Sequence, residues 1–123
     1  MNLELAHEFT YRVTLKPPVS FGQGPLGLRT YFEAIGGEAE GPRFTATAIG
    51  GGGDWILAGA DGYGRIDVRL QFQTHDDAFV YMHYFGLLEM NAAAVNAMVS
   101  GGSTTYEDQY FRTTPRMETG DAR

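Results

Sequence analysis

The chain has 123 residues, 43% of them hydrophobic and 20% charged, which is the composition of one globular domain (residues 1–123) and not of a disordered protein. Fifteen acidic residues against nine basic ones give a net charge of −6, so we expect neither nucleic acid nor a membrane surface as a partner. The absence of cysteine excludes disulfides, thiolate metal sites and thiol nucleophiles.

The beginning of the chain carries no pattern of a secreted or membrane-spanning protein. The apolar runs are shorter than the about 18–20 residues that span a bilayer. Glu4 and Glu8 lie where a signal peptide has a basic start followed by a long apolar stretch. We therefore expect a cytoplasmic protein.

Glycines and prolines divide the chain into short runs rich in β-branched and aromatic residues, which are typical of strands. In chain order the runs are Leu3–Leu15, Leu28–Ile35, Arg43–Ile49, Trp55–Ala58, Arg65–Thr74, Phe79–Phe85 and Thr104–Thr114. Between the first two, Gly22–Gly27 fits the dinucleotide pattern G-x-G-x-x-G. Pro25 and a strand-like run follow where that motif requires a helix, so we interpret this segment as a loop.

Two runs alternate with a period of two, which gives each strand two different faces. In the run Arg65–Thr74, one face holds Ile66, Val68, Leu70 and Phe72, and the other holds Arg65, Asp67, Arg69, Gln71 and Gln73. In the next run, one face holds Phe79, Tyr81, His83 and Phe85, and the other holds Val80, Met82 and Tyr84. A tight connection at His75–Asp77 predicts a hairpin.

One segment, Leu88–Val99, has the pattern of a helix. It contains three consecutive alanines and ends at Ser100-Gly-Gly, a favourable C-terminal cap. A helix of about a dozen residues is marginal alone, so we expect it to pack across a barrel end or an interface. The predicted fold is all-β, mainly antiparallel: a small β-barrel with one short helix near residues 88–99.

Several motifs together resemble the bacterial and fungal family known as domain of unknown function 3237. They are Gly36-Gly to Gly41-Pro, Gly50-Gly-Gly-Gly-Asp-Trp55, Asp61-Gly62, Asp67-Val-Arg69 and the tail Tyr110–Gly120. The resemblance implies a small antiparallel β-barrel that is often oligomeric, so we expect a homo-oligomer. Members of the family run on into a further aromatic strand where this chain ends, and we expect a neighbouring subunit, the helix or solvent to cover the gap.

The glycine run Gly50–Gly53 is costly in regular structure, since each glycine costs about 0.5–1 kcal/mol relative to alanine. We interpret it as a turn at a barrel corner that projects Asp54 and Trp55 in opposite directions. On a functional interpretation Asp54 is a base or anchor at a pocket and Trp55 an aromatic wall. On a structural one Trp55 is in the core and Asp54 caps the turn.

Three further residues are candidates for acid/base work. Asp67 and Arg69 lie on one face of a strand, where they either hold each other and a ligand inside the barrel or form a solvated pair outside it. His83 lies between Tyr81 and Phe85, a lining suited to a planar ligand, although a lone histidine on such a face is more often structural. Tyr84 points away from His83.

The tail contributes Tyr110, Arg112 and Glu118. Tyr110 and Arg112 face the same way on an extended strand, and Arg112 has Glu118 or a ligand's acidic group as candidate partners. A structural role, in which the tail closes the barrel, is the alternative. The glycine run lacks the Gly-Lys-Ser/Thr of a phosphate-binding loop. The three histidines have no metal-ligand spacing, so we expect no metal site; His83, Glu89 and Asp54 would form one only if the fold brought them together.

These residues favour a cofactor-free enzyme that binds a small apolar or aromatic carbonyl compound. His83, Asp54, Asp67 and Arg69 would carry the catalysis, and Trp55, Tyr81, Phe85, Tyr110 and Arg112 the binding. The chemistry would be isomerisation, cyclisation, hydration or elimination. The alternatives are a carrier that binds without turnover and an interaction protein with aromatic faces buried between subunits.

Overall fold

A computed structural model describes residues 1–123 and contains seven strands and one helix. The elements are β1 (Thr10–Leu15), β2 (Val19–Gly24), β3 (Gly27–Glu40), β4 (Thr45–Ala58), β5 (Tyr63–Thr74), β6 (Phe79–Glu89), α1 (Ala92–Ser100) and β7 (Phe111–Glu118). The structure has no helix that is long and apolar enough to span a membrane.

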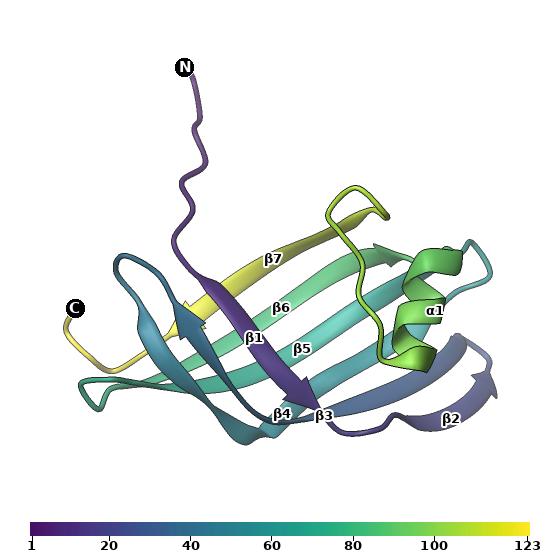
Figure 1. Cartoon of the computed structure of the whole chain (residues 1–123), viewed down its shortest axis with the longest axis horizontal. Helices are drawn as coiled ribbons and strands as arrows, with labels where there is room; N and C mark the ends of the chain where they lie inside the picture. Colours follow the sequence, from purple (N-terminus) through teal and green to yellow (C-terminus); the bar gives the residue numbers. More distant parts are fainter.

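All strands belong to one antiparallel sheet in the order β1-β3-β4-β5-β6-β7, and β2 pairs with the other half of β3. The sheet curls strongly, and β1 crosses in front of its concave side (Figure 1). The prediction of a mainly antiparallel, barrel-like protein with one short helix is confirmed. The sheet does not close, since β1 and β7 do not pair.

Strand β4 runs without a break through the glycine run, so the predicted turn at Gly50–Gly53 is wrong. Gly50, Gly51 and Gly52 lie opposite Leu70 alone, which makes the run a bulge of three residues against one inside the strand. Gly51 has φ of 102°, in the region that favours glycine. A Cβ on Gly52 would lie 2.2 Å from the Arg69 carbonyl oxygen, so the neighbouring strand approaches too closely for any side chain there.

Two other predicted boundaries are also wrong. The segment Gly22–Gly27, interpreted as a loop, holds the end of β2, a two-residue turn and the first residue of β3, and β2 and β3 form a hairpin through Gly24 and Gly27. β7 begins only at Phe111, because Tyr106–Gln109 form a turn before it. Both segments are rich in glycine or polar residues, and their strand conformation comes from pairing with a neighbour, not from local preference.

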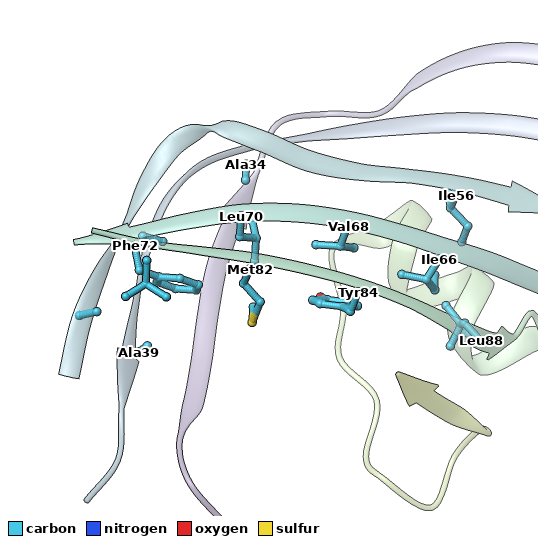
Figure 2. Close-up of a cluster of buried hydrophobic side chains, with 14 residues drawn as sticks. Ala34, Ala39, Ile56, Ile66, Val68, Leu70, Phe72, Met82, Tyr84 and Leu88 are labelled. Atoms are coloured by element: carbon cyan, nitrogen blue, oxygen red, sulfur yellow. The ribbon is translucent and has the colours of Figure 1, made fainter. Parts of the chain in front are cut away.

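The concave face holds the core, and Figure 2 shows its side chains extending along the sheet from Phe72 and Ala39 at one end to Ile66 and Leu88 at the other. The predicted alternation is confirmed: β5 buries Ile66, Val68, Leu70 and Phe72, and β6 buries Val80, Met82 and Tyr84. Phe72 and Met82 are fully buried. We call this concave side the inner face of the sheet and the opposite side the outer face.

Helix α1 starts later than predicted, because Leu88 and Glu89 complete β6. The Asn91 side chain accepts the Ala94 N–H at 3.0 Å and caps the first turn. Gly101, with φ of 70°, ends the helix as the Ser100-Gly-Gly pattern predicted. Ala94 is buried, and α1 lies at one end of the sheet (Figure 1), which agrees with the expected packing across a barrel end.

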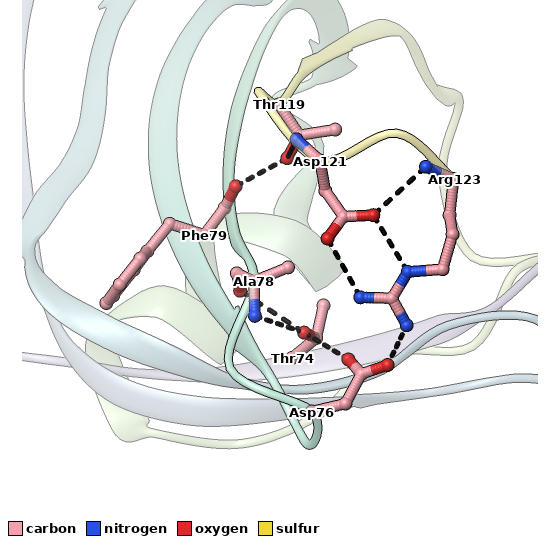
Figure 3. Close-up of polar contacts among 7 residues, drawn as sticks. All are labelled: Thr74, Asp76, Ala78, Phe79, Thr119, Asp121 and Arg123. Atoms are coloured by element: carbon pink, nitrogen blue, oxygen red, sulfur yellow. Dashed lines mark hydrogen bonds and ion pairs between the residues drawn. The ribbon is translucent and has the colours of Figure 1, made fainter.

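The end of the chain is tied to the β5–β6 turn at the opposite end of the sheet (Figure 3). The predicted tight connection is present, with Asp77 at φ of 70°. Arg123 forms ion pairs with Asp76 and with Asp121, and the Thr119 hydroxyl donates to the Phe79 carbonyl at 2.8 Å. These contacts hold the segment after β7 against β6.

Candidate functional site

Asp54 introduces a carboxyl group into the otherwise apolar inner face. It lies opposite Phe32 on β3 and Val68 on β5, while the next residue, Trp55, faces outward. The predicted projection of these two residues in opposite directions is therefore confirmed. The bulge just before them carries β4 past Leu70 with the faces unchanged, so that Ala48, Asp54 and Ile56 all lie on the inner side.

The surroundings of Asp54 change its acidity. Its Oδ1 accepts the backbone N–H of Asp67 at 3.3 Å, which favours the carboxylate. Burial acts in the other direction and prevails, and the Asp67 carboxylate adds to it, so the pKa of Asp54 is raised from 3.8 to about 6. Asp54 is partly buried and therefore still within reach of solvent.

Two tyrosine hydroxyls share this inner region. Tyr84 lies opposite Val68, one strand beyond Asp54, and its hydroxyl is hydrogen-bonded to that of Tyr11, which β1 brings over the concave side. Burial raises the pKa of both tyrosines, and the Asp54 carboxylate raises both further. Both hydroxyls therefore keep their protons at neutral pH and remain hydrogen-bond donors.

The sequence pattern selected Asp54 as a candidate but neither tyrosine. Tyr84 stands in the alternating row of Val80 and Met82, and a hydroxyl on such an apolar row was a usable signal. Tyr11 offered no such signal. Its position depends on the pairing of Tyr11 with Ala39 and on the crossing of β1, which no local pattern contains.

Six other predicted site residues lie together, but on the outer face: Trp55, Asp67, Arg69, Tyr81, His83 and Phe85. The interpretation that placed them in a barrel interior is wrong. The inner positions of β5 and β6 belong to the core residues that alternate with them, so these six face away from the concave side. The structural interpretation that placed Trp55 in the core is wrong for the same reason.

On this outer face His83 Nε2 lies 3.0 Å from Asp67 Oδ1, and the His83 ring packs 4.7 Å from the Phe85 ring. Arg69 forms no hydrogen bond or ion pair within the chain, so the predicted Asp67–Arg69 pair is replaced by Asp67–His83. Trp55 stacks on Tyr31 with ring centroids 4.6 Å apart.

Tyr110 and Arg112 lie at the start of β7, and Arg112 is on the outer face opposite Leu87. Arg112 donates to the Tyr106 hydroxyl at 2.5 Å, and its guanidinium lies over the Tyr106 and Tyr110 rings at 4.7 and 5.0 Å. The predicted pairing of Arg112 with Glu118 is wrong, because Glu118 is at the other end of the strand beside Tyr81.

Two clefts lie away from Asp54. One of about 290 Å³ is at the chain end of Figure 3, between Arg43, His75, Val80 and Met117, and one of about 380 Å³ opens on the outer face between Phe79, Tyr81 and Glu118. Neither includes Asp54 or Tyr84. No three His, Asp or Glu side chains are grouped closely enough to hold a metal ion, and His83 and Asp54 point to opposite faces.

Comparison with known proteins finds a family and several relatives that this chain resembles. The family model described as "Protein of unknown function (DUF3237)" matches residues 3–123. A UPF0311 protein of Rhodopseudomonas palustris is 26% identical over 118 residues, which cover 96% of this chain and 77% of the relative. A UPF0311 protein of Clostridium acetobutylicum is 28% identical over 112 residues, 90% of this chain and 71% of the relative.

Solved structures agree. The crystal structure of a conserved protein of unknown function from R. palustris has a TM-score of 0.81 at 26% identity and covers 94% of this chain and 75% of its own. A beta-barrel like protein from Acinetobacter baumannii has a TM-score of 0.68 at 19% identity, with 98% of this chain and 82% of the other covered. The second likeness concerns the fold alone.

Proposed function

This chain belongs to the DUF3237 family, and we propose that it binds a small carbonyl compound on its inner face and transfers a proton on it without a cofactor. The observation that carries the proposal is the raised pKa of Asp54, about 6, beside two tyrosine hydroxyls in an apolar surrounding. Groups with strongly shifted pKa values cluster at functional sites. Of the residues that the sequence suggested for acid/base work, the proposed reaction uses Asp54.

Asp54 is suited to the part of general base. With a pKa of about 6 it is mostly ionised at neutral pH, yet it holds a proton more strongly than an ordinary aspartate. A base whose pKa lies near the working pH combines a large ionised fraction with a favourable proton affinity. It would take the proton from the carbon next to a carbonyl group, and the C–H electron pair would move into an enolate.

Tyr84 and Tyr11 are suited to stabilise that enolate. One hydroxyl donates to the other, which leaves the second O–H of the pair to donate to the carbonyl oxygen as negative charge develops there. Asp54 would then return its proton to another carbon of the same compound. The sum of the two steps is an isomerisation in which no proton or electron is gained or lost.

Aromatic side chains near this site favour a planar substrate. Phe32 lies opposite Asp54, and Tyr11 packs edge-on against Phe72 with centroids 6.1 Å apart. A site with apolar walls and a few polar groups is the usual form of a small-molecule pocket. We therefore propose an aromatic or polyketide-like carbonyl compound as the substrate class.

The test follows the exchange of carbon-bound hydrogen for deuterium in 1-phenylbutane-1,3-dione and simple aryl ketones, by ¹H NMR in D₂O. We expect the protein to accelerate the exchange, and Asp54→Asn to slow it by at least about 100-fold, the usual contribution of a general base. Tyr84→Phe should slow it less, because Tyr11 retains a hydroxyl.

Asp77→Asn is the matched control, since it removes a carboxylate from an exposed turn and asparagine tolerates its positive φ. It should exchange like the wild type. Saturable ligand shifts without any exchange would instead support the alternative of a carrier, and equal exchange by wild type and Asp54→Asn would refute Asp54 as the base.

A further inference from the structure

The outer face of β6, the strand next to the edge strand β7, carries an apolar row. We call Phe79, Tyr81, His83, Phe85 and Leu87 the β6 ridge. Its four apolar members are exposed by 63%, 39%, 58% and 41%, respectively. β6 pairs with β5 on one side and β7 on the other, so the exposure of the ridge does not come from an unpaired edge strand.

The strands on both sides of the ridge are polar on this face. β5 presents Arg65, Asp67, Arg69 and Gln71, and β7 presents Arg112, Thr114, Arg116 and Glu118. Contiguous exposed apolar surface with a polar rim marks an interaction site. Because the sheet edges are not involved, the fitting partner is one that packs face to face, as stacked sheets do.

The order of charges along these strands matches a second copy of the same face. A two-fold axis across the strands at the level of Tyr84 lays β6 antiparallel on β6 of the other copy, because Val68, Tyr84 and Pro115 share that level. Asp67 then faces the partner's Arg69, and Arg69 faces the partner's Asp67. Likewise Arg112 faces the partner's Glu118, and Glu118 faces the partner's Arg112. The two-fold symmetry therefore forms each ion pair twice.

The alternative symmetric arrangement has the opposite charge pattern. An axis along β6 places β5 of one copy over β7 of the other at the same level. Arg69 would then face the partner's Arg116, because both are level with His83. Like charges brought together at an interface are strongly unfavourable, so the antiparallel arrangement is selected.

The free charges support this assignment. Arg69 and Glu118 have no hydrogen bond or ion pair within the chain, although they flank the ridge. The antiparallel arrangement gives each an opposite charge and buries the ridge, with His83 against the partner's Phe85 and Tyr81 against the partner's Leu87. We propose that the outer face of β5, β6 and β7 forms an isologous dimer with a second copy of this chain.

The test uses two charge reversals and the mixture of both. Sedimentation equilibrium should find a dimer for the wild type. Asp67→Arg and Arg69→Asp should each weaken association at least about tenfold, because each creates two like-charge pairs across the axis. An equimolar mixture of the two variants should restore the dimer as a heterodimer, since every Asp67–Arg69 position then again joins opposite charges.

Two further variants separate the surface from the fold. Phe85→Glu should dissociate the dimer, and Arg12→Asp on β1 should leave it intact although it makes the same charge change as Arg69→Asp. Circular dichroism checks that each variant is folded. Asp54→Asn should remain dimeric. The proposed catalysis is therefore tested with Asp54→Asn, and the dimer is tested separately with the charge reversals and Phe85→Glu.

Three results would overturn the proposal. The first is a wild type that stays monomeric up to about millimolar concentration, where a weak interface of this class would already associate. The second is a dimer that the charge reversals and Phe85→Glu leave unchanged, since it would use another surface. The third is a mixture of the two reversals that does not associate better than either variant alone.

Discussion

The two faces of the sheet distribute polarity in opposite ways. The buried core of the inner face is apolar apart from Asp54 and the hydroxyls of Tyr11 and Tyr84 beside it, whereas on the outer face the β6 ridge lies between the polar rows of β5 and β7. On each face the exceptional side chains are ones that the fold itself does not require. A carboxyl group inside costs free energy, and an aromatic row outside gains none, and these two exceptions are the features on which the two proposals rest.

The largest difference between the faces is expected for two phenylalanines on neighbouring strands. Phe72 is fully buried, so Phe72→Ala should destabilise the protein by about 3–5 kcal/mol. Phe79 is 63% exposed, and Phe79→Ala should change the stability of the dilute protein by about 0.5 kcal/mol or less. Urea unfolding measures both. Similar losses for the two variants would mean that the faces are assigned wrongly.

The glycine bulge that precedes Asp54 and Trp55 offers the next test. A Cβ on Gly52 would meet backbone of β5 at 2.2 Å, so Gly52→Ala should cost about 1–3 kcal/mol. On Gly50 the nearest atom would be 3.5 Å away, an ordinary contact, and Gly50→Ala should be nearly neutral. Thermal unfolding compares the two, and a sensitive Gly50 would contradict the bulge.

Asp54 should make stability depend on pH in an unusual direction. Its pKa is about 6 in the folded protein and 3.8 in the unfolded chain, so folding binds a proton between these values and stability falls as pH rises through that window. Asp54→Asn keeps an acceptor for the Asp67 N–H but removes the charge. It should stabilise the protein by roughly 1–3 kcal/mol at pH 7 and hardly at all at pH 3.5.

Urea midpoints of the wild type and Asp54→Asn across this pH range measure the effect. Asp77→Asn, in its exposed turn, should show no such window. A wild type whose stability rises between pH 4 and 6 relative to Asp54→Asn would show that burial does not dominate the acidity of Asp54.

The smallest effect is expected on the outer face. Asp67 and His83 are partly exposed, so Asp67→Asn should change stability by less than about 1 kcal/mol. The same substitution removes a negative charge that raises the pKa of Asp54 from the other side of the sheet. The Asp54 pKa, followed by ¹³C NMR of its carboxyl, should therefore fall. An unchanged value would mean that the faces are electrostatically independent.

The alternation of β5 and β6 was sufficient to divide their residues between two faces, because period two is a property of the strand itself. It did not reveal which face is covered. The aromatic row Tyr81–Phe85 looked as suited to an interior as the row of Val80 and Met82, and only the curl of the whole sheet decides between them. Asp54 was predicted as a candidate site residue from its glycine motif. Tyr11 was not predicted, because its place near Asp54 depends on a strand far away in the sequence.

The number of glycines before Asp54 has a consequence for insertions and deletions. Three residues of β4 stand where β5 has one. Because the two extra residues are an even number, side chains along β4 keep alternating between the same two faces before and after the bulge. Loss of a single glycine would exchange the positions of the carboxyl and the indole, whereas loss of two would leave both where they are. Variants in this run should therefore tolerate changes in length only in steps of two.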